Sequence, residues 1–170
     1  MYTRNLLWLV SLVSAAPLYA ADVPANTPLA PQQVFRYNNH SDPGTLDPQK
    51  VEENTAAQIV LDLFEGLVWM DGEGQVQPAQ AERWEILDGG KRYIFHLRSG
   101  LQWSDGQPLT AEDFVLGWQR AVDPKTASPF AGYLAQAHIN NAAAIVAGKA
   151  DVTSLGVKAT DDRTLEVTLE

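Results

Sequence analysis

Cysteine is absent from the 170 residues, and basic residues are few. Without cysteine, the chain offers no disulfide, no thiolate metal ligand, no cysteine nucleophile and no cysteine for lipid attachment. The 12 Lys and Arg are outnumbered by 21 Asp and Glu, which leaves a formal net charge of -9. A nucleic-acid binder needs a basic face for the phosphate backbone, so this balance argues against DNA or RNA as a partner.

Common catalytic signatures are also missing. The sequence contains no G-x-S-x-G, G-x-x-x-x-G-K, H-E-x-x-H or G-x-G-x-x-G motif. The three histidines, His40, His96 and His138, stand far apart in the sequence, so we expect neither a metal site nor a cofactor. Chance pairs among so many carboxylates keep an acid-base enzyme open as the last alternative. The prediction is a binding protein rather than an enzyme.

The longest apolar stretch, residues 6–16, is too short to span a bilayer. Arg4 precedes it and small residues follow, so residues 1–20 are predicted to be a signal peptide that is cleaved before Ala21. An uncleaved anchor is the alternative interpretation. An exported, cysteine-free protein without a membrane anchor suits the bacterial periplasm, where we expect a monomer that is not embedded in the membrane.

Residue patterns predict a mixed α/β fold. Alternating apolar and polar residues predict strands at residues 34–37, 92–98 and 164–170. Apolar residues at helical spacing predict helices at residues 55–65, 110–123 and 133–147. Thr55, followed by Gln58, and Thr110, followed by acids, are predicted to cap the first two helices, and Gly148 to end the third. Glycines between apolar residues predict a hairpin at residues 69–76.

Three tryptophans, Trp84, Trp103 and Trp118, lie inside patterned segments. Their size and positions favour the core over the lining of a pocket, which stays the alternative.

Two stretches carry a resemblance to a known family. They read WEILDGGKRYIFHLR over residues 84–98 and WSDGQPLTAEDF over residues 103–114. Shorter stretches extend the match: TLDP at 45–48, LFEGL at 63–67, WQRAVDP at 118–124, TASPF at 126–130 and DDRTLEV at 161–167. In order and spacing, the chain resembles the extracytoplasmic solute-binding proteins, family 5, which serve peptide-type ABC transporters.

The resemblance implies a periplasmic-binding-protein-like type II fold with two lobes. By this analogy, residues 21–64 begin the first lobe and residues 65–170 form most of a small domain packed on it. A strand pattern that runs to Glu170 suggests an N-terminal fragment without the second lobe.

The resemblance also implies a ligand site and partners. In the oligopeptide branch, ligand contacts follow the L-D-P motif, which corresponds to Glu52, Glu53 and Asn54, and come from a tyrosine that is replaced here by Phe130. The implied activity is capture of a peptide or peptide-like solute and its delivery to an ABC transporter permease. Because Phe130 lacks the phenolic hydroxyl, a non-peptide amphipathic molecule is an alternative ligand, and chaperone-like binding is an alternative activity.

Overall fold

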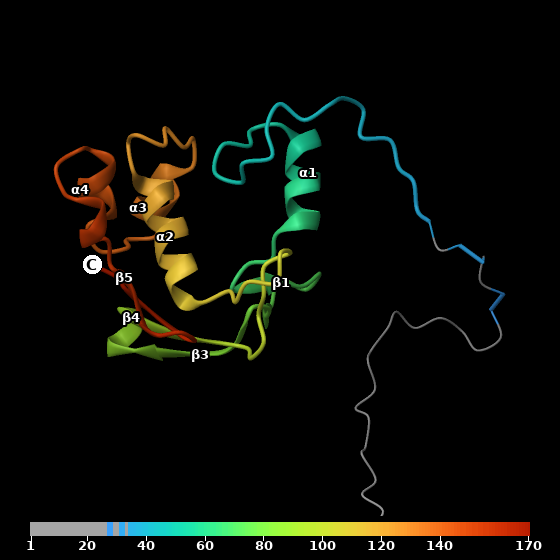
Figure 1. Ribbon diagram of the computed structural model, residues 1–170. Coiled ribbons are helices and arrows are strands. Elements are labelled where there is room, and N and C mark those ends of the chain that lie inside the picture. Colours follow the sequence, from blue (N-terminus) through green and yellow to red (C-terminus); the bar gives the residue numbers. More distant parts are fainter. Residues whose placement is uncertain (1–26, 29–30, 33) are drawn as a thin grey trace, which may run out of the picture. The chain divides into compact units, whose positions relative to one another are not determined.

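The computed structural model describes residues 27–28, 31–32 and 34–170, and the chain divides into two units, residues 1–38 and 39–170 (Figure 1). The predicted signal peptide lies outside the described residues. In the first unit the strand expected at residues 34–37 is wrong, because this stretch takes no regular secondary structure. Phe35 is 87% exposed and its ring stacks on Tyr37, with centroids 6.0 Å apart. A strand needs a hydrogen-bonded neighbour, which alternation over four residues does not reveal.

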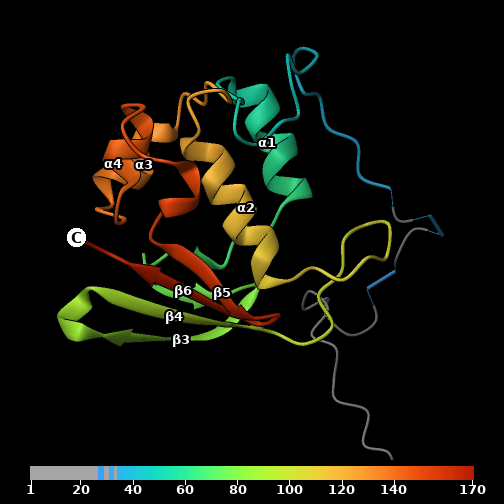
Figure 2. The same cartoon turned by 60° about the vertical axis from the view of Figure 1, so that its left-hand side comes forward.

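A four-stranded antiparallel sheet forms one layer of the second unit (Figure 2). Its strands, in spatial order, are β3 (Ala81–Leu87), β4 (Arg92–Leu97), β6 (Thr164–Thr168) and β5 (Val157–Asp161). Strands β4 and β6 confirm two predicted strands, although β4 ends one residue and β6 two residues before the predicted end. Alternation places Phe95, Leu97, Leu165 and Val167 on the face that carries the core.

Helix α2 (Ala111–Val122) packs on this face of the sheet and buries Val115 and Val122 (Figure 2). The predicted cap is confirmed, because Thr110 and Asp113 form a capping box in which the Thr110 backbone N–H donates to Asp113 Oδ2 over 2.7 Å. The helix ends before Pro124, which has no N–H with which to continue it.

The single helix expected at residues 133–147 is wrong. Two short helices, α3 (Ala131–Gln136) and α4 (Ala142–Val146), take its place. His138 and Asn141 between them adopt positive φ angles of 56° and 64°, which interrupt the helical hydrogen bonds. Gly148, with a φ of 68°, follows the end of α4 as predicted. A 3-10 helix, η2 (Val152–Ser154), leads into β5.

The predicted hairpin is confirmed as β1 (Val68–Met70) paired with β2 (Val76–Pro78). Asp71 shapes its turn by accepting the backbone N–H groups of Glu73 and Gln75 over 3.1 and 2.7 Å. A 3-10 turn, η1 (Asp88–Gly90), connects β3 to β4.

Helix α1 (Asn54–Leu63) begins one residue earlier than expected. Its N-cap is Glu53, and Thr55 lies inside the first turn, so the capping box predicted for Thr55 and Gln58 is wrong. Gln58 instead donates to Asp62 Oδ1 over 3.3 Å.

The apolar stripe of α1 is largely uncovered. Ala56 is the only buried residue of the helix, whereas Leu61 and Leu63 are 73% and 61% exposed. Among the described residues, no helix is long and apolar enough to cross a membrane.

Close packing around Gly156 gives a test of the fold. A Cβ at this position would lie 2.7 Å from Asn140 Cβ and from the backbone oxygen of Thr168. We therefore expect Gly156→Ala to lower the free energy of unfolding by about 1–3 kcal/mol, because overpacking forces backbone shifts. The matched control is Gly117→Ala in α2, where a Cβ meets no atom within 4 Å and removal of a helical glycine should raise stability. Urea unfolding measures both changes, and equal effects would contradict this packing.

Candidate functional site

An ion pair joins the loop before α1 to α2. Arg120 Nη2 lies 2.6 Å from Asp47 Oδ2, and Arg120 Nη1 lies 2.9 Å from Asp47 Oδ1. The same Nη1 donates to Gln49 Oε1 over 2.7 Å. This bidentate geometry fixes the orientation of both partners, as a planar guanidinium does with a carboxylate.

The ion pair changes the acidity of the carboxyl group. The hydrogen bond from Arg120 lowers the pKa of Asp47 from 3.8 to about 2. The backbone N–H of Gln49 donates to Asp47 Oδ1 over 3.1 Å and acts in the same direction. The carboxylate is therefore charged at any pH at which the protein would work.

Gln49 extends the connection to a third segment. Its side-chain Nε2 donates to the backbone oxygen of Gly117 in α2 over 2.5 Å. Its backbone oxygen accepts a 2.7 Å hydrogen bond from the Ser128 hydroxyl, and Ser128 Oγ accepts the backbone N–H of Phe130 over 3.2 Å. In both views, the loop that leads into α1 lies beside the loop between α2 and α3 (Figures 1 and 2).

These contacts position the four residues that the sequence indicates as ligand groups. Glu52, Glu53 and Asn54 are exposed at the N-terminus of α1. Glu53 Oε2 accepts the backbone N–H of Gly44 over 3.1 Å, so one of these carboxylates is partly engaged. Phe130 is half-buried at the N-cap of α3.

Phe130 is part of an aromatic pair. Its ring stacks on that of Tyr133, with centroids 5.7 Å apart and an angle of 17° between the planes. Tyr133 is 63% exposed, so the pair offers one phenol to solvent. The hydrogen bond from Ser128 to Gln49 brings the two loops together, whereas the described contacts do not join Phe130 directly to Glu52, Glu53 or Asn54.

Sequence reasoning did not identify the residues that hold these loops. Asp47 and Arg120 are 73 positions apart and Gln49 and Ser128 are 79 apart, so no local pattern connects them. The sequence signal for Asp47, Arg120 and Ser128 is their presence inside the quoted stretches TLDP, WQRAVDP and TASPF, and Gln49 directly follows the first of them.

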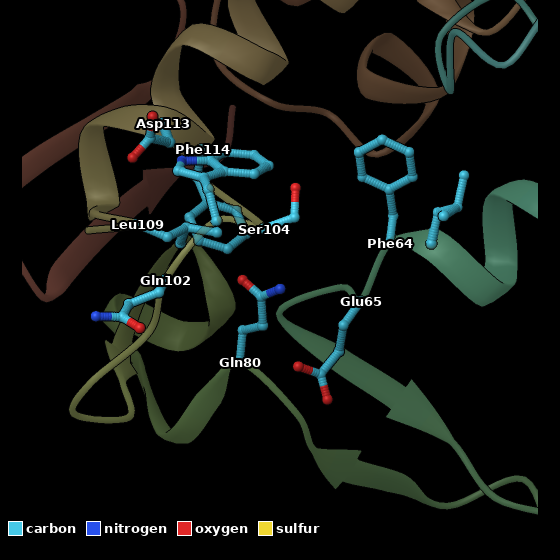
Figure 3. Close-up of a pocket in the computed structure, with 10 residues that line it drawn as sticks. Phe64, Glu65, Gln80, Gln102, Ser104, Leu109, Asp113 and Phe114 are labelled. Carbon is cyan, nitrogen blue, oxygen red and sulfur yellow. The ribbon is translucent and has the colours of Figure 1, made fainter. Parts of the chain in front are cut away.

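A cavity of about 550 Å³ lies at the other end of α1 (Figure 3). Its residues come from the end of α1 and the next residues, the connection between β2 and β3, the loop before α2, and the first turn of α2: Leu63, Phe64, Glu65, Gln80, Gln102, Trp103, Ser104, Leu109, Asp113 and Phe114. Trp103 is 42% exposed and lines this cavity, so for this residue the pocket alternative holds and the core position is wrong. Trp118 packs against the core. Ten helical residues place this cavity about 15 Å from Glu53 along the helix.

The described part of the chain was also searched for clusters of metal-ligating side chains. In residues 27–28, 31–32 and 34–170, His, Cys, Asp and Glu form no group of three or more that could hold an ion. His96 Nε2 lies 2.8 Å from Glu85 Oε1 on adjacent strands of the sheet, which is a pairwise surface contact.

Comparison with known protein families identifies the family of this chain. Residues 75–170 match the family described as bacterial extracellular solute-binding proteins, family 5 Middle. The chain belongs to this family. The resemblance stated from the sequence is thereby confirmed, and members of this family are binding proteins.

Curated relatives are similar in sequence to this chain along most of its length. The periplasmic oligopeptide-binding protein OppA of Salmonella typhimurium is 51% identical over 161 residues, which cover 95% of this chain and 30% of the relative. The periplasmic murein peptide-binding protein MppA of Escherichia coli is 46% identical over 162 residues, covering 95% and 30%. The chain therefore spans about 30% of the length of these relatives.

Solved structures of other proteins are similar in fold to this chain. Haemophilus influenzae OppA, in complex with the peptide RPPGFSPFR, matches with a TM-score of 0.73 and 45% identity, over 78% of this chain and 26% of that one. The Escherichia coli murein tripeptide-binding protein MppA matches with a TM-score of 0.72 and 47% identity, over 75% and 25%. These neighbours have the periplasmic-binding-protein-like type II fold, and the mixed α/β architecture of this chain corresponds to part of it.

The Asp47–Arg120 pair gives a pH-dependent prediction. A carboxyl group whose pKa is lower in the folded than in the unfolded state stabilises the fold above its unfolded value, 3.8, and this contribution is lost as the pH falls toward about 2. Because both groups are partly exposed to solvent, we expect Asp47→Asn to cost about 1 kcal/mol at pH 7.

The test is a double-mutant cycle with Arg120→Gln, followed by urea unfolding between pH 7 and pH 2.5. The coupling between Asp47 and Arg120 should be constant near neutral pH and shrink below about pH 4. A coupling that is zero at pH 7, or that does not change with pH, would contradict the ion pair.

Proposed function

We propose that the chain is part of a periplasmic solute-binding protein of an ABC importer, which binds peptides or peptide-like solutes and delivers them to a membrane permease. The observation that carries the proposal is 51% identity over 161 residues with a protein named as an oligopeptide-binding protein. The structural neighbour in complex with RPPGFSPFR supports a peptide over a non-peptide ligand or chaperone-like binding. Catalysis forms no part of the proposed activity.

The proposed ligand groups are Glu52, Glu53, Asn54 and Phe130. The two carboxylates are exposed and belong to a strongly acidic chain, which favours an amine-bearing ligand such as the N-terminus of a peptide. Asn54 offers both a donor and an acceptor to a peptide backbone. Phe130, backed by Tyr133, offers an apolar ring face to a ligand side chain in place of a hydroxyl.

The proposed mechanism is closure of two lobes around the solute, followed by docking of the closed form on the permease. In this scheme residues 21–64 begin the first lobe and residues 65–170 form a small domain packed on it. The Gln49–Ser128 and Arg120–Asp47 contacts support the scheme, because they hold the proposed ligand loops together. A freely diffusing monomer would suffice for such a receptor.

Exposed carboxylates allow a direct test of the ligand class. We expect the double variant Glu52→Gln and Glu53→Gln to weaken binding of a peptide with a free amino terminus about tenfold, which corresponds to about 1.4 kcal/mol. The N-acetylated form of the same peptide should bind the variant and the parent equally. Isothermal titration with protein purified from its own host measures both affinities.

The matched control is the double variant Glu73→Gln and Glu112→Gln, which removes two exposed carboxylates from the hairpin turn and from α2. It should leave both affinities unchanged. If Glu52→Gln with Glu53→Gln also leaves them unchanged, the proposed role of these carboxylates is wrong, and if no peptide binds the parent, the proposed function is wrong.

Export gives a second test. The protein released from its host by osmotic shock should have Ala21 as its first residue, because small residues at the cleavage site and the short apolar run suit signal peptidase. Intact mass and N-terminal sequencing measure this. Retention of Met1 in a membrane fraction would instead indicate the uncleaved anchor.

A further inference from the structure

Two aromatic side chains form a stacked pair at the start of α3. The rings of Phe130 and Tyr133 have centroids 5.7 Å apart and an angle of 17° between their planes. Phe130 is half-buried, whereas Tyr133 is 63% exposed, so one face of the Tyr133 ring is packed and the other faces solvent. An aromatic ring has few rotatable bonds, and a ring that rests on a second ring offers a rigid surface to a ligand.

The packing of α3 keeps Tyr133 pointing outwards. Leu134 and Ala135 pack against the core, so a rotation of the helix that buried Tyr133 would expose them. The Tyr133 N–H donates to Phe130 O over 2.9 Å, and the Ala137 N–H donates to Tyr133 O over 2.9 Å. The exposure of the Tyr133 ring is therefore a consequence of how the helix is anchored.

Small residues leave the surroundings of the pair open. Ala131 and Gly132 separate Phe130 from Tyr133 in the sequence. A Cβ at Gly132 would come no closer than 4.0 Å to a described atom, which is Gln136 Nε2. The residue before Tyr133 thus carries no side chain that could cover the ring.

Hydrogen bonds connect the pair to the proposed ligand loop. Ser128 Oγ accepts the Phe130 N–H over 3.2 Å, and the Ser128 hydroxyl donates to Gln49 O over 2.7 Å. Gln49 precedes Glu52 by three residues in the sequence. The Tyr133 ring is therefore fixed relative to the loop that leads to Glu52, and a surface that selects ligand side chains needs such support.

We propose that Tyr133 is a specificity-determining residue that favours peptides with an aromatic side chain. The ligand ring stacks on the open face of Tyr133 and extends the pair to three rings. Stacked aromatic rings attract one another beyond the apolar area that they bury, so a peptide with phenylalanine should bind about fivefold more tightly than its leucine counterpart. The inference rests on the proposed function, because it requires a peptide ligand, and it adds a residue and a class of ligand to that function.

Three pairs of tripeptides test this selection. Each is an alanine tripeptide with either phenylalanine or leucine at the first, second or third position, and isothermal titration with protein purified from its own host gives the affinity ratio of each pair. In the parent, one pair should favour phenylalanine about fivefold. Tyr133→Leu should reduce this ratio to about one, whereas Tyr133→Phe, which retains the ring, should preserve it.

The matched control is Trp69→Leu, which removes a 55% exposed aromatic ring from the β1–β2 hairpin and should leave the ratio unchanged. Equal binding of every pair by the parent, a ratio that persists in Tyr133→Leu, or a ratio that is lost in Tyr133→Phe or Trp69→Leu would overturn the inference without affecting the proposed function. A parent that binds none of the peptides would overturn the proposed function itself. If Tyr133→Leu does not fold, Tyr133→Gln removes the ring with another side chain that helices accept.

Discussion

The bidentate ion pair between Arg120 and Asp47 is the contact on which the arrangement of the candidate ligand loops depends. Arg120 belongs to α2, which is anchored on the sheet through Val115 and Val122, so the guanidinium extends from the rigid part of the unit. Its hydrogen bond to Gln49 orients a residue that in turn contacts Ser128. The Arg120 side chain thereby fixes two exposed loops relative to the core.

Local chemistry was enough to predict part of the fold. The capping box at Thr110 and the alternation in β4 and β6 depend on residues within a few positions of one another, and the structure confirms them. The hairpin is equally local, because Asp71 accepts the N–H groups of its own turn. Such elements can be predicted from the sequence because the residues that determine their conformation lie within the elements themselves.

The errors arise where a distant contact or a competing local geometry decides the outcome. The segment at residues 34–37 has the alternation of a strand but no strand neighbour in the described part of the chain. Positive φ angles at His138 and Asn141 divide an alanine-rich stretch that composition favours as one helix. Trp103 shows the same limit for the site, since it lines a cavity together with Phe64 at the end of α1, about 40 residues earlier in the chain.

Helix α1 links the two regions of interest. Its N-terminus carries Glu53 and Asn54 and follows the loop held by Arg120, whereas its C-terminus borders the cavity with the unpaired Gln80 oxygen. Ten helical residues separate these two regions by about 15 Å along the helix axis. Because its own packing buries only Ala56, the orientation of α1 is decided by what contacts its two ends.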